Sequence, residues 1–120
     1  MSPKTQHSGT SVESWARHPL GRQLLMIANE MNRASKLLGP GDEERLRHGY
    51  ERVLALADLT IETRPRPGVL REMLRWRDLV AALYIAPSDP VEHGRAFRAL
   101  LQLHPDTWRQ LPYVTGAASG

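Results

Sequence analysis

The sequence predicts an all-α protein, an antiparallel four-helix bundle. Apolar residues recur at three- and four-residue intervals over four segments, which proline, glycine and aspartate residues separate. No run of strictly alternating apolar and polar residues predicts a β-strand. The 120 residues, 41% of them hydrophobic, are enough for one core. We therefore expect a single domain over about residues 11–114, with flexible tails at 1–10 and 115–120.

The first long helix is expected from Pro19 to about Leu38. A residue before proline disfavours helical geometry, so His18 stays outside, and Pro19 suits the first helical position. The Gly-Pro-Gly sequence at 39–41 ends the helix. A short extra helical turn is predicted before it, at about residues 11–17.

The second helix is expected to begin after Asp42 and to run to about Thr63. Asp42 is a good N-cap residue, and the two glutamates that follow it favour the positive end of the helix dipole. Two prolines and a glycine within 64–68 end this helix, because they cannot continue it.

The third helix is expected from about Val69 to Ala86. Its apolar residues span a wide arc, which predicts that it is the most buried of the four helices. Trp76 lies at the centre of this arc and is expected in the core, not stacked on a nucleic-acid base. The arc comprises Leu70, Met73, Leu74, Trp76, Val80, Leu83 and Tyr84.

The fourth helix is expected from Pro90 to about His104. Asp89 would cap it, and Pro90 would occupy the first helical position. The His104–Pro105 step ends the helix, and one more short helical turn is predicted at about residues 106–111.

Arg77 falls inside the apolar arc of the third helix, where a charge needs a partner or a route to solvent. We expect it to pair with Asp58 or Glu62 of the second helix. The alternative is an arginine that binds an anion in a cleft, and Arg71, Arg75 and Arg77 together are candidate contacts for a partner or an anion.

His93 and His104 both project into the apolar arc of the fourth helix, so we expect them to be partly buried and hydrogen-bonded. They lie about 16 Å apart along an ideal helix, too far for one metal ion. Proton transfer or pH sensing is the alternative, because histidine titrates near neutral pH. No metal ligand set and no cofactor motif is identified in the sequence.

The composition excludes several function classes. The absence of cysteine rules out disulfides, thiolate nucleophiles and metal sites that require thiolate. The first ten residues have no apolar run typical of a signal peptide, and no segment approaches the roughly 20 apolar residues of a membrane span. We therefore expect a cytoplasmic protein without a membrane anchor.

The net charge of +3 invites a nucleic-acid interpretation, so its distribution matters. The second helix with its cap carries about −3, and the third helix with the preceding arginines about +3. Such compensation between helices gives only weak support to a nucleic-acid-binding module. The residues for that alternative are Arg64, Arg66, Arg71 and Arg75.

A second alternative comes from Arg98 and His104, whose spacing is similar to the Arg-x(4–6)-His motif of HEPN-type ribonucleases, which are also helical bundles. This resemblance implies a ribonuclease or toxin that uses the two residues as catalytic groups. It covers two residues only, and about one to two such matches are expected by chance in this sequence. Ala99 stands where that motif commonly has a polar residue. No family is assigned on this basis.

The leading hypothesis is a non-enzymatic accessory protein that docks a protein partner or a second copy of itself. Motifs that carry chemistry are lacking, and five apolar residues lie outside the predicted stripes. Such residues indicate either wide burial or an extra interface, and we expect a homodimer. The five are Leu25, Met26, Leu37, Leu59 and Leu79.

Overall fold

The computed structural model describes residues 11–86 and 89–109, and over these residues it contains helices and no strand. The four long helices are α2 (Leu20–Ser35), α3 (Glu43–Glu62), α4 (Pro67–Ile85) and α5 (Pro90–Leu101). Two short helices, α1 (Val12–Ala16) and α6 (Pro105–Trp108), flank them. The predicted all-α fold with four long helices and short turns near both ends is confirmed.

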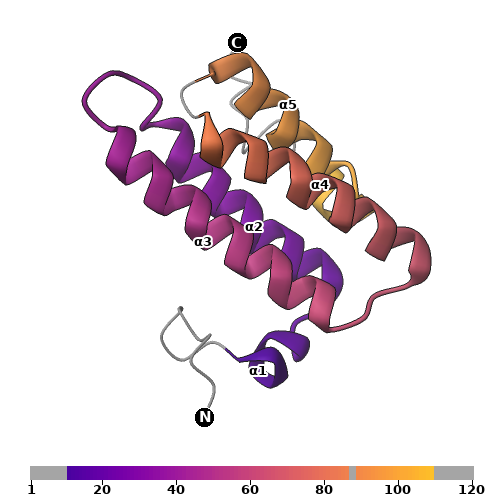
Figure 1. The fold of residues 1–120 in the computed structure, drawn as a ribbon. Coiled ribbons are helices and arrows are strands. Elements are labelled where there is room, and N and C mark those ends of the chain that lie inside the picture. Colours follow the sequence, from indigo (N-terminus) through magenta and orange to yellow (C-terminus); the bar gives the residue numbers. More distant parts are fainter. Residues whose placement is uncertain (1–10, 87–88, 110–120) are drawn as a thin grey trace.

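The four long helices run antiparallel to their neighbours in sequence and close into a ring (Figure 1). Each of α2, α3 and α4 packs against the helix that follows it, and α5 returns to pack against α2. The short helices extend this bundle at its surface, since α1 packs on α3 and α6 packs on α2. The helices therefore surround one shared core.

Side-chain caps fix two of the helix starts. At α5, the Asp89 carboxylate accepts hydrogen bonds from the backbone N–H groups of Val91 and Glu92, at 3.0 and 3.2 Å, as predicted for an N-cap aspartate. At α1, Ser11 and Ser14 form a reciprocal capping box. Asp42 occupies the N-cap position of α3, but its side chain makes no capping hydrogen bond there.

Two helices end three residues earlier than the sequence predicts. The N–H groups of Lys36 and Leu37 bond to carbonyls three residues back, so α2 ends at Ser35 in a tightened turn and not at Leu38. A similar bond from the Leu103 N–H to the Leu100 carbonyl, 3.1 Å long, follows the end of α5. His104 therefore lies in the turn between α5 and α6 and not on α5.

The most buried helix is α2, with seven buried residues, whereas α4 has four. The prediction that the third helix is the most buried is therefore wrong. The helix α2 contacts α3, α5 and α6, but α4 contacts only its two bundle neighbours to a comparable extent. The wide apolar arc of α4 exceeds the surface these neighbours cover, and Leu74 at its edge remains 47% exposed.

Two buried tryptophans tie neighbouring helices together through their indole N–H groups. Trp15 of α1 donates to the Thr60 hydroxyl of α3 at 2.9 Å. Trp76 of α4, a core residue as predicted, donates to the backbone carbonyl of Ala96 in α5 at 2.7 Å. Both side chains are 2% exposed, so these hydrogen bonds satisfy groups that water cannot reach.

Candidate interaction surface

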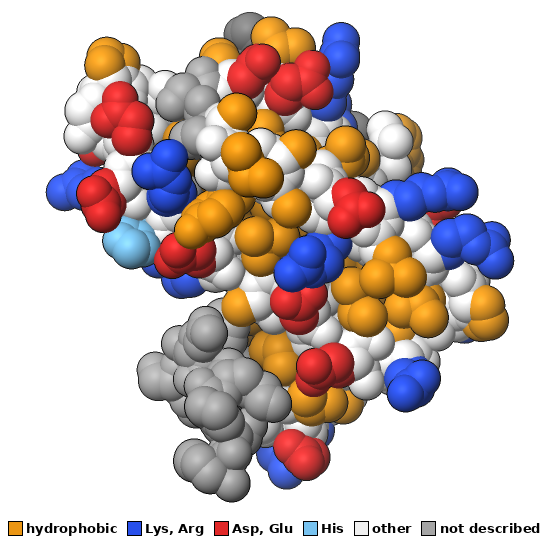
Figure 2. Space-filling view, in the orientation of Figure 1, with side chains coloured by type: hydrophobic (Ala, Val, Ile, Leu, Met, Phe, Trp, Pro, Cys, Tyr) orange, Lys and Arg blue, Asp and Glu red, His pale blue; other side chains and the backbone are white. Residues whose placement is uncertain are grey.

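Several large apolar side chains are exposed on the solvent-facing side of α4 and at the start of α5. Leu74 and Leu79 are 47% and 49% exposed, and Ile85 at the end of the helix is 77% exposed. Val91, in the first turn of α5, is 61% exposed. Figure 2 shows hydrophobic side chains over α4 and between α4 and α3, with charged side chains among them.

Charged residues of both signs share this side of α4. Arg71, Arg75 and Asp78 are all exposed. Arg75 forms an ion pair with Glu72 on its own helix at 3.2 Å, and such an exposed pair contributes little stability. Within the described residues, Arg71 and Asp78 form no hydrogen bond or ion pair through their side chains. These two charges are therefore available to a partner.

Arg77 points toward α3 and holds Asp58 by a two-point ion pair. Its Nε donates to one carboxylate oxygen, and its Nη2 donates to the other at 3.2 Å. The guanidinium and the carboxylate are 35% and 46% exposed. The hydrogen bond that Arg77 donates to Asp58 raises the pKa of Arg77. Asp58 is one of the two partners the sequence indicated, and an external anion would have to displace it.

A second polar contact joins α4 to α3 nearer the C-terminal end of α4. The Tyr84 hydroxyl donates to the Glu51 carboxylate at 2.9 Å, and His48 lies 3.1 Å from the other oxygen of the same carboxylate. The hydrogen bonds from His48 and Tyr84 lower the pKa of Glu51, and the hydrogen bond to Glu51, together with its charge, raises the pKa of Tyr84. Together with the Arg77 pair, this contact orients α4 about its own axis.

His93 lies in the centre of the bundle and is 2% exposed. Its Nδ1 accepts from the Tyr50 hydroxyl at 2.6 Å, and its Nε2 donates to the Met31 carbonyl at 3.0 Å. A carbonyl can only accept, so the Nε2 atom carries the proton. Burial lowers the pKa of His93 and raises the pKa of Tyr50 to about 12. His93 is thus a neutral, hydrogen-bonded core residue without access to solvent.

The structure places Arg98 and His104 on different elements. Arg98 is exposed on α5, and His104 is half-buried in the turn after that helix. The backbone carbonyl of His104 accepts from the Thr107 hydroxyl at 2.8 Å and from the Trp108 N–H at 2.9 Å. Arg98 and His104 therefore do not lie on one continuous helix.

The five off-stripe residues mostly contribute to the core and not to an interface. Leu79 is exposed, whereas the other four are half-buried. Three of those four pack against the core: Met26, Leu37 and Leu59. Leu74 and Ile85 were not among the residues expected at an interface, and their exposure follows from how much of α4 its neighbours cover.

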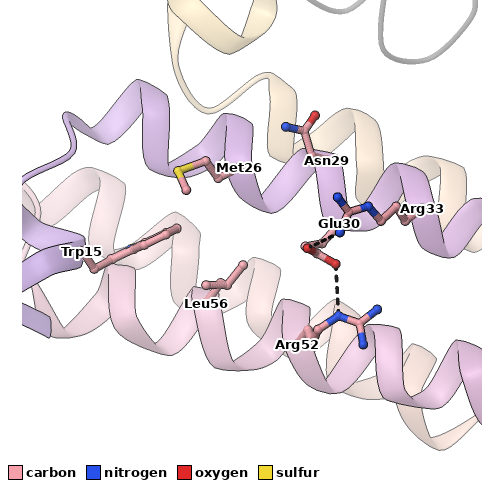
Figure 3. A pocket seen from close by; sticks show the side chains of 7 residues that line it. All are labelled: Trp15, Met26, Asn29, Glu30, Arg33, Arg52 and Leu56. Carbon is pink, nitrogen blue, oxygen red and sulfur yellow. Dashed lines mark hydrogen bonds and ion pairs between the residues drawn. The ribbon is translucent and has the colours of Figure 1, made fainter. Parts of the chain in front are cut away.

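A surface pocket of about 330 Å³ lies between α2 and α3 (Figure 3). Three apolar side chains line one part of it: Trp15, Met26 and Leu56. On the other part, the Glu30 carboxylate accepts from Arg33 at 3.0 Å and from Arg52 at 3.2 Å. The arginines are thus engaged by a carboxylate of the protein itself.

Over residues 11–86 and 89–109, no three histidine, aspartate or glutamate side chains are close enough to hold a metal ion. None of the helices in the described part of the chain is long and apolar enough to cross a membrane. Comparison with protein-family models, with curated proteins and with solved structures finds no match to this chain. The proposals for its function therefore depend on the chemistry of its surface.

Proposed function

We propose that this protein is a non-enzymatic interaction module that associates with a second copy of itself. One observation carries the proposal: Leu74, Leu79 and Ile85 are exposed on a single helix, and Val91 is exposed just beyond it. Isolated exposed leucines are ordinary on protein surfaces. Several large apolar side chains on one helix side, with charges between them, are typical of an interaction surface.

The contacts between α4 and α3 support a preformed surface. The Arg77–Asp58 pair and the Tyr84–Glu51 hydrogen bond hold α4 from the side that faces α3. The exposed leucines consequently face solvent in a fixed arrangement, and a partner would not have to order the helix when it binds.

The test is the molecular mass in solution as a function of concentration. We expect sedimentation equilibrium between about 5 and 500 μM to show a mass that rises from one chain toward two, as for a weak dimer with a dissociation constant in the micromolar range. Leu79→Glu should keep the mass at one chain over the same range. A wild-type protein that remains one chain throughout contradicts the proposed self-association.

A nucleic-acid-binding module is the second candidate, supported by the arginines at the start of α4. Arg64, Arg66 and Arg71 are exposed and make no side-chain ion pair with another described residue. Basic side chains gather at the end of the bundle where α4 begins (Figure 2). This candidate predicts oligonucleotide binding that weakens steeply with salt. No binding at about 20 mM salt would remove it, because counterion release is strongest there.

A further inference from the structure

The exposed side of α4 has a self-complementary order of side chains. At about 100° per residue, Leu74, Asp78, Arg75 and Leu79 follow one another around roughly 140° of the helix. All four are exposed. An acidic and a basic residue thus lie side by side at the centre of this surface, and a leucine borders each of them.

We propose that two copies of the chain associate through their α4 helices, which lie side by side and antiparallel. The two-fold axis is perpendicular to both helices, at the level of the peptide bond between Trp76 and Arg77. This proposal rests on the proposed self-association and specifies its geometry. Residues 75 and 78 are equally distant from that level, so Arg75 of one copy meets Asp78 of the other, and the reverse. The pairing creates two identical ion pairs from two residues of each chain.

The same axis places the leucines where they can be buried. Leu74 of both copies lies on one side of the ion pairs, and Leu79 of both copies lies on the other side. Arg71 is level with Ala82 of the second copy, and the small Ala82 side chain lets the helices approach closely. The charged centre is thereby flanked by apolar contacts, which shield it from water.

Charge complementarity favours a second copy over a foreign partner on this surface. Arg71 and Asp78 have no ion-pair partner among the described residues, and Arg75 is held only by the exposed Glu72. A copy of the same helix supplies the Asp78 carboxylate to each Arg75 without any further protein. The contact extends over at most about 28 Å of helix, so we expect a weak dimer with a smaller interface than the standard 1,200–2,000 Å².

The decisive experiment exchanges the charges. In Arg75→Asp and in Asp78→Arg, like charges meet twice across the axis, and we expect each variant to raise the dimer dissociation constant about tenfold or more. The double variant restores opposite charges and should return to nearly the wild-type value. An equimolar mixture of the two single variants should form a heterodimer. Arg22→Asp is the matched control for Arg75→Asp, because it makes the same change in net charge at an exposed position on α2.

A crosslinking measurement provides an independent check, because the chain contains no cysteine. Leu79→Cys should give a covalent dimer with a short bis-maleimide, and Arg22→Cys should not. Circular dichroism on each variant verifies that it is folded.

The outcomes separate the two proposals. If the wild type dimerises but neither single charge variant weakens it, the α4 pairing is overturned while self-association stands. If the single variants weaken dimerisation but their mixture and the double variant fail to restore it, the pairing of Arg75 with Asp78 is overturned. A monomeric wild type at all concentrations overturns both.

Discussion

The hydroxyl of Tyr50 lies 2.6 Å from Nδ1 of His93, and this buried hydrogen bond joins α3 to α5 across the centre of the bundle. The other ring nitrogen of His93 bonds to the Met31 carbonyl of α2, so one imidazole on α5 links α5 to both α2 and α3. The Tyr50 hydroxyl, both ring nitrogens of His93 and the Met31 carbonyl all have a partner in this network, which is the condition under which burial of such groups is tolerated.

Tyr50→Phe should lower the free energy of unfolding by about 1–3 kcal/mol, because it leaves the buried Nδ1 of His93 without a donor. Urea denaturation at pH 7.5 measures the change. Tyr84→Phe removes the same atom from a hydrogen bond at the surface, and its unfolding midpoint should stay close to that of the wild type. Equal losses in the two variants would contradict this account.

His93 should make the protein sensitive to mild acid. Burial places its folded-state pKa below the ordinary value of 6.5. As the pH falls through about 6.5, the unfolded chain gains a proton that the folded chain excludes, so the free energy of unfolding decreases by up to about 1.4 kcal/mol per pH unit. The loss continues until the pH reaches the folded-state pKa and is absent above about pH 7.5.

The variant His93→Gln isolates this effect, since the glutamine amide can accept from Tyr50 and donate to Met31. Its free energy of unfolding should change less between pH 7.5 and pH 5.5 than that of the wild type. The remaining histidines are present in both proteins and cancel in the difference. A variant with the same pH dependence as the wild type would show that His93 is not the titrating group.

The Arg77–Asp58 ion pair should contribute less than about 1 kcal/mol, because both groups are partly exposed and screened by solvent. A double-mutant cycle with Arg77→Met and Asp58→Asn measures the coupling while it keeps the volume of both side chains. The coupling should shrink in about 1 M salt, where the Debye length is about 3 Å. A coupling above about 2 kcal/mol that is insensitive to salt would indicate a buried pair.

The short helix α1 should depend on the Trp15–Thr60 hydrogen bond. Thr60→Val preserves the side-chain shape but removes the acceptor, and we expect a loss of about 1–2 kcal/mol. Hydrogen exchange should accelerate most at the amides of 12–16, because α1 has few other contacts that cross the bundle. Thr63→Val, whose hydroxyl bonds only within its own turn, is the control.

The sequence was sufficient to predict the helices, because their limits depend on local chemistry. Asp89 caps α5 as expected, and a break at the proline-containing stretch separates α3 from α4, with Pro67 as the first residue of α4. The early ends of α2 and α5 could not be predicted, since a tightened last turn leaves no mark on the spacing of apolar residues.

The surface was harder to predict than the fold. A helical wheel marks Leu74 as apolar and close to the core, but whether a neighbour covers it depends on how the helices pack. Leu59 shows the opposite error, because it lies outside its stripe yet packs against the core. The Arg77–Asp58 pair was predictable because a charge inside an apolar arc requires a partner nearby.

The three tryptophans described above also give the protein a set of natural fluorophores in distinct surroundings. Trp15 reports on the docking of α1, Trp76 on the contact between α4 and α5, and the half-exposed Trp108 on the surface at α6. Variants that retain one indole each would show distinct emission maxima, with Trp108 at the longest wavelength. Stopped-flow refolding of these variants could then time the closure of the bundle helix by helix.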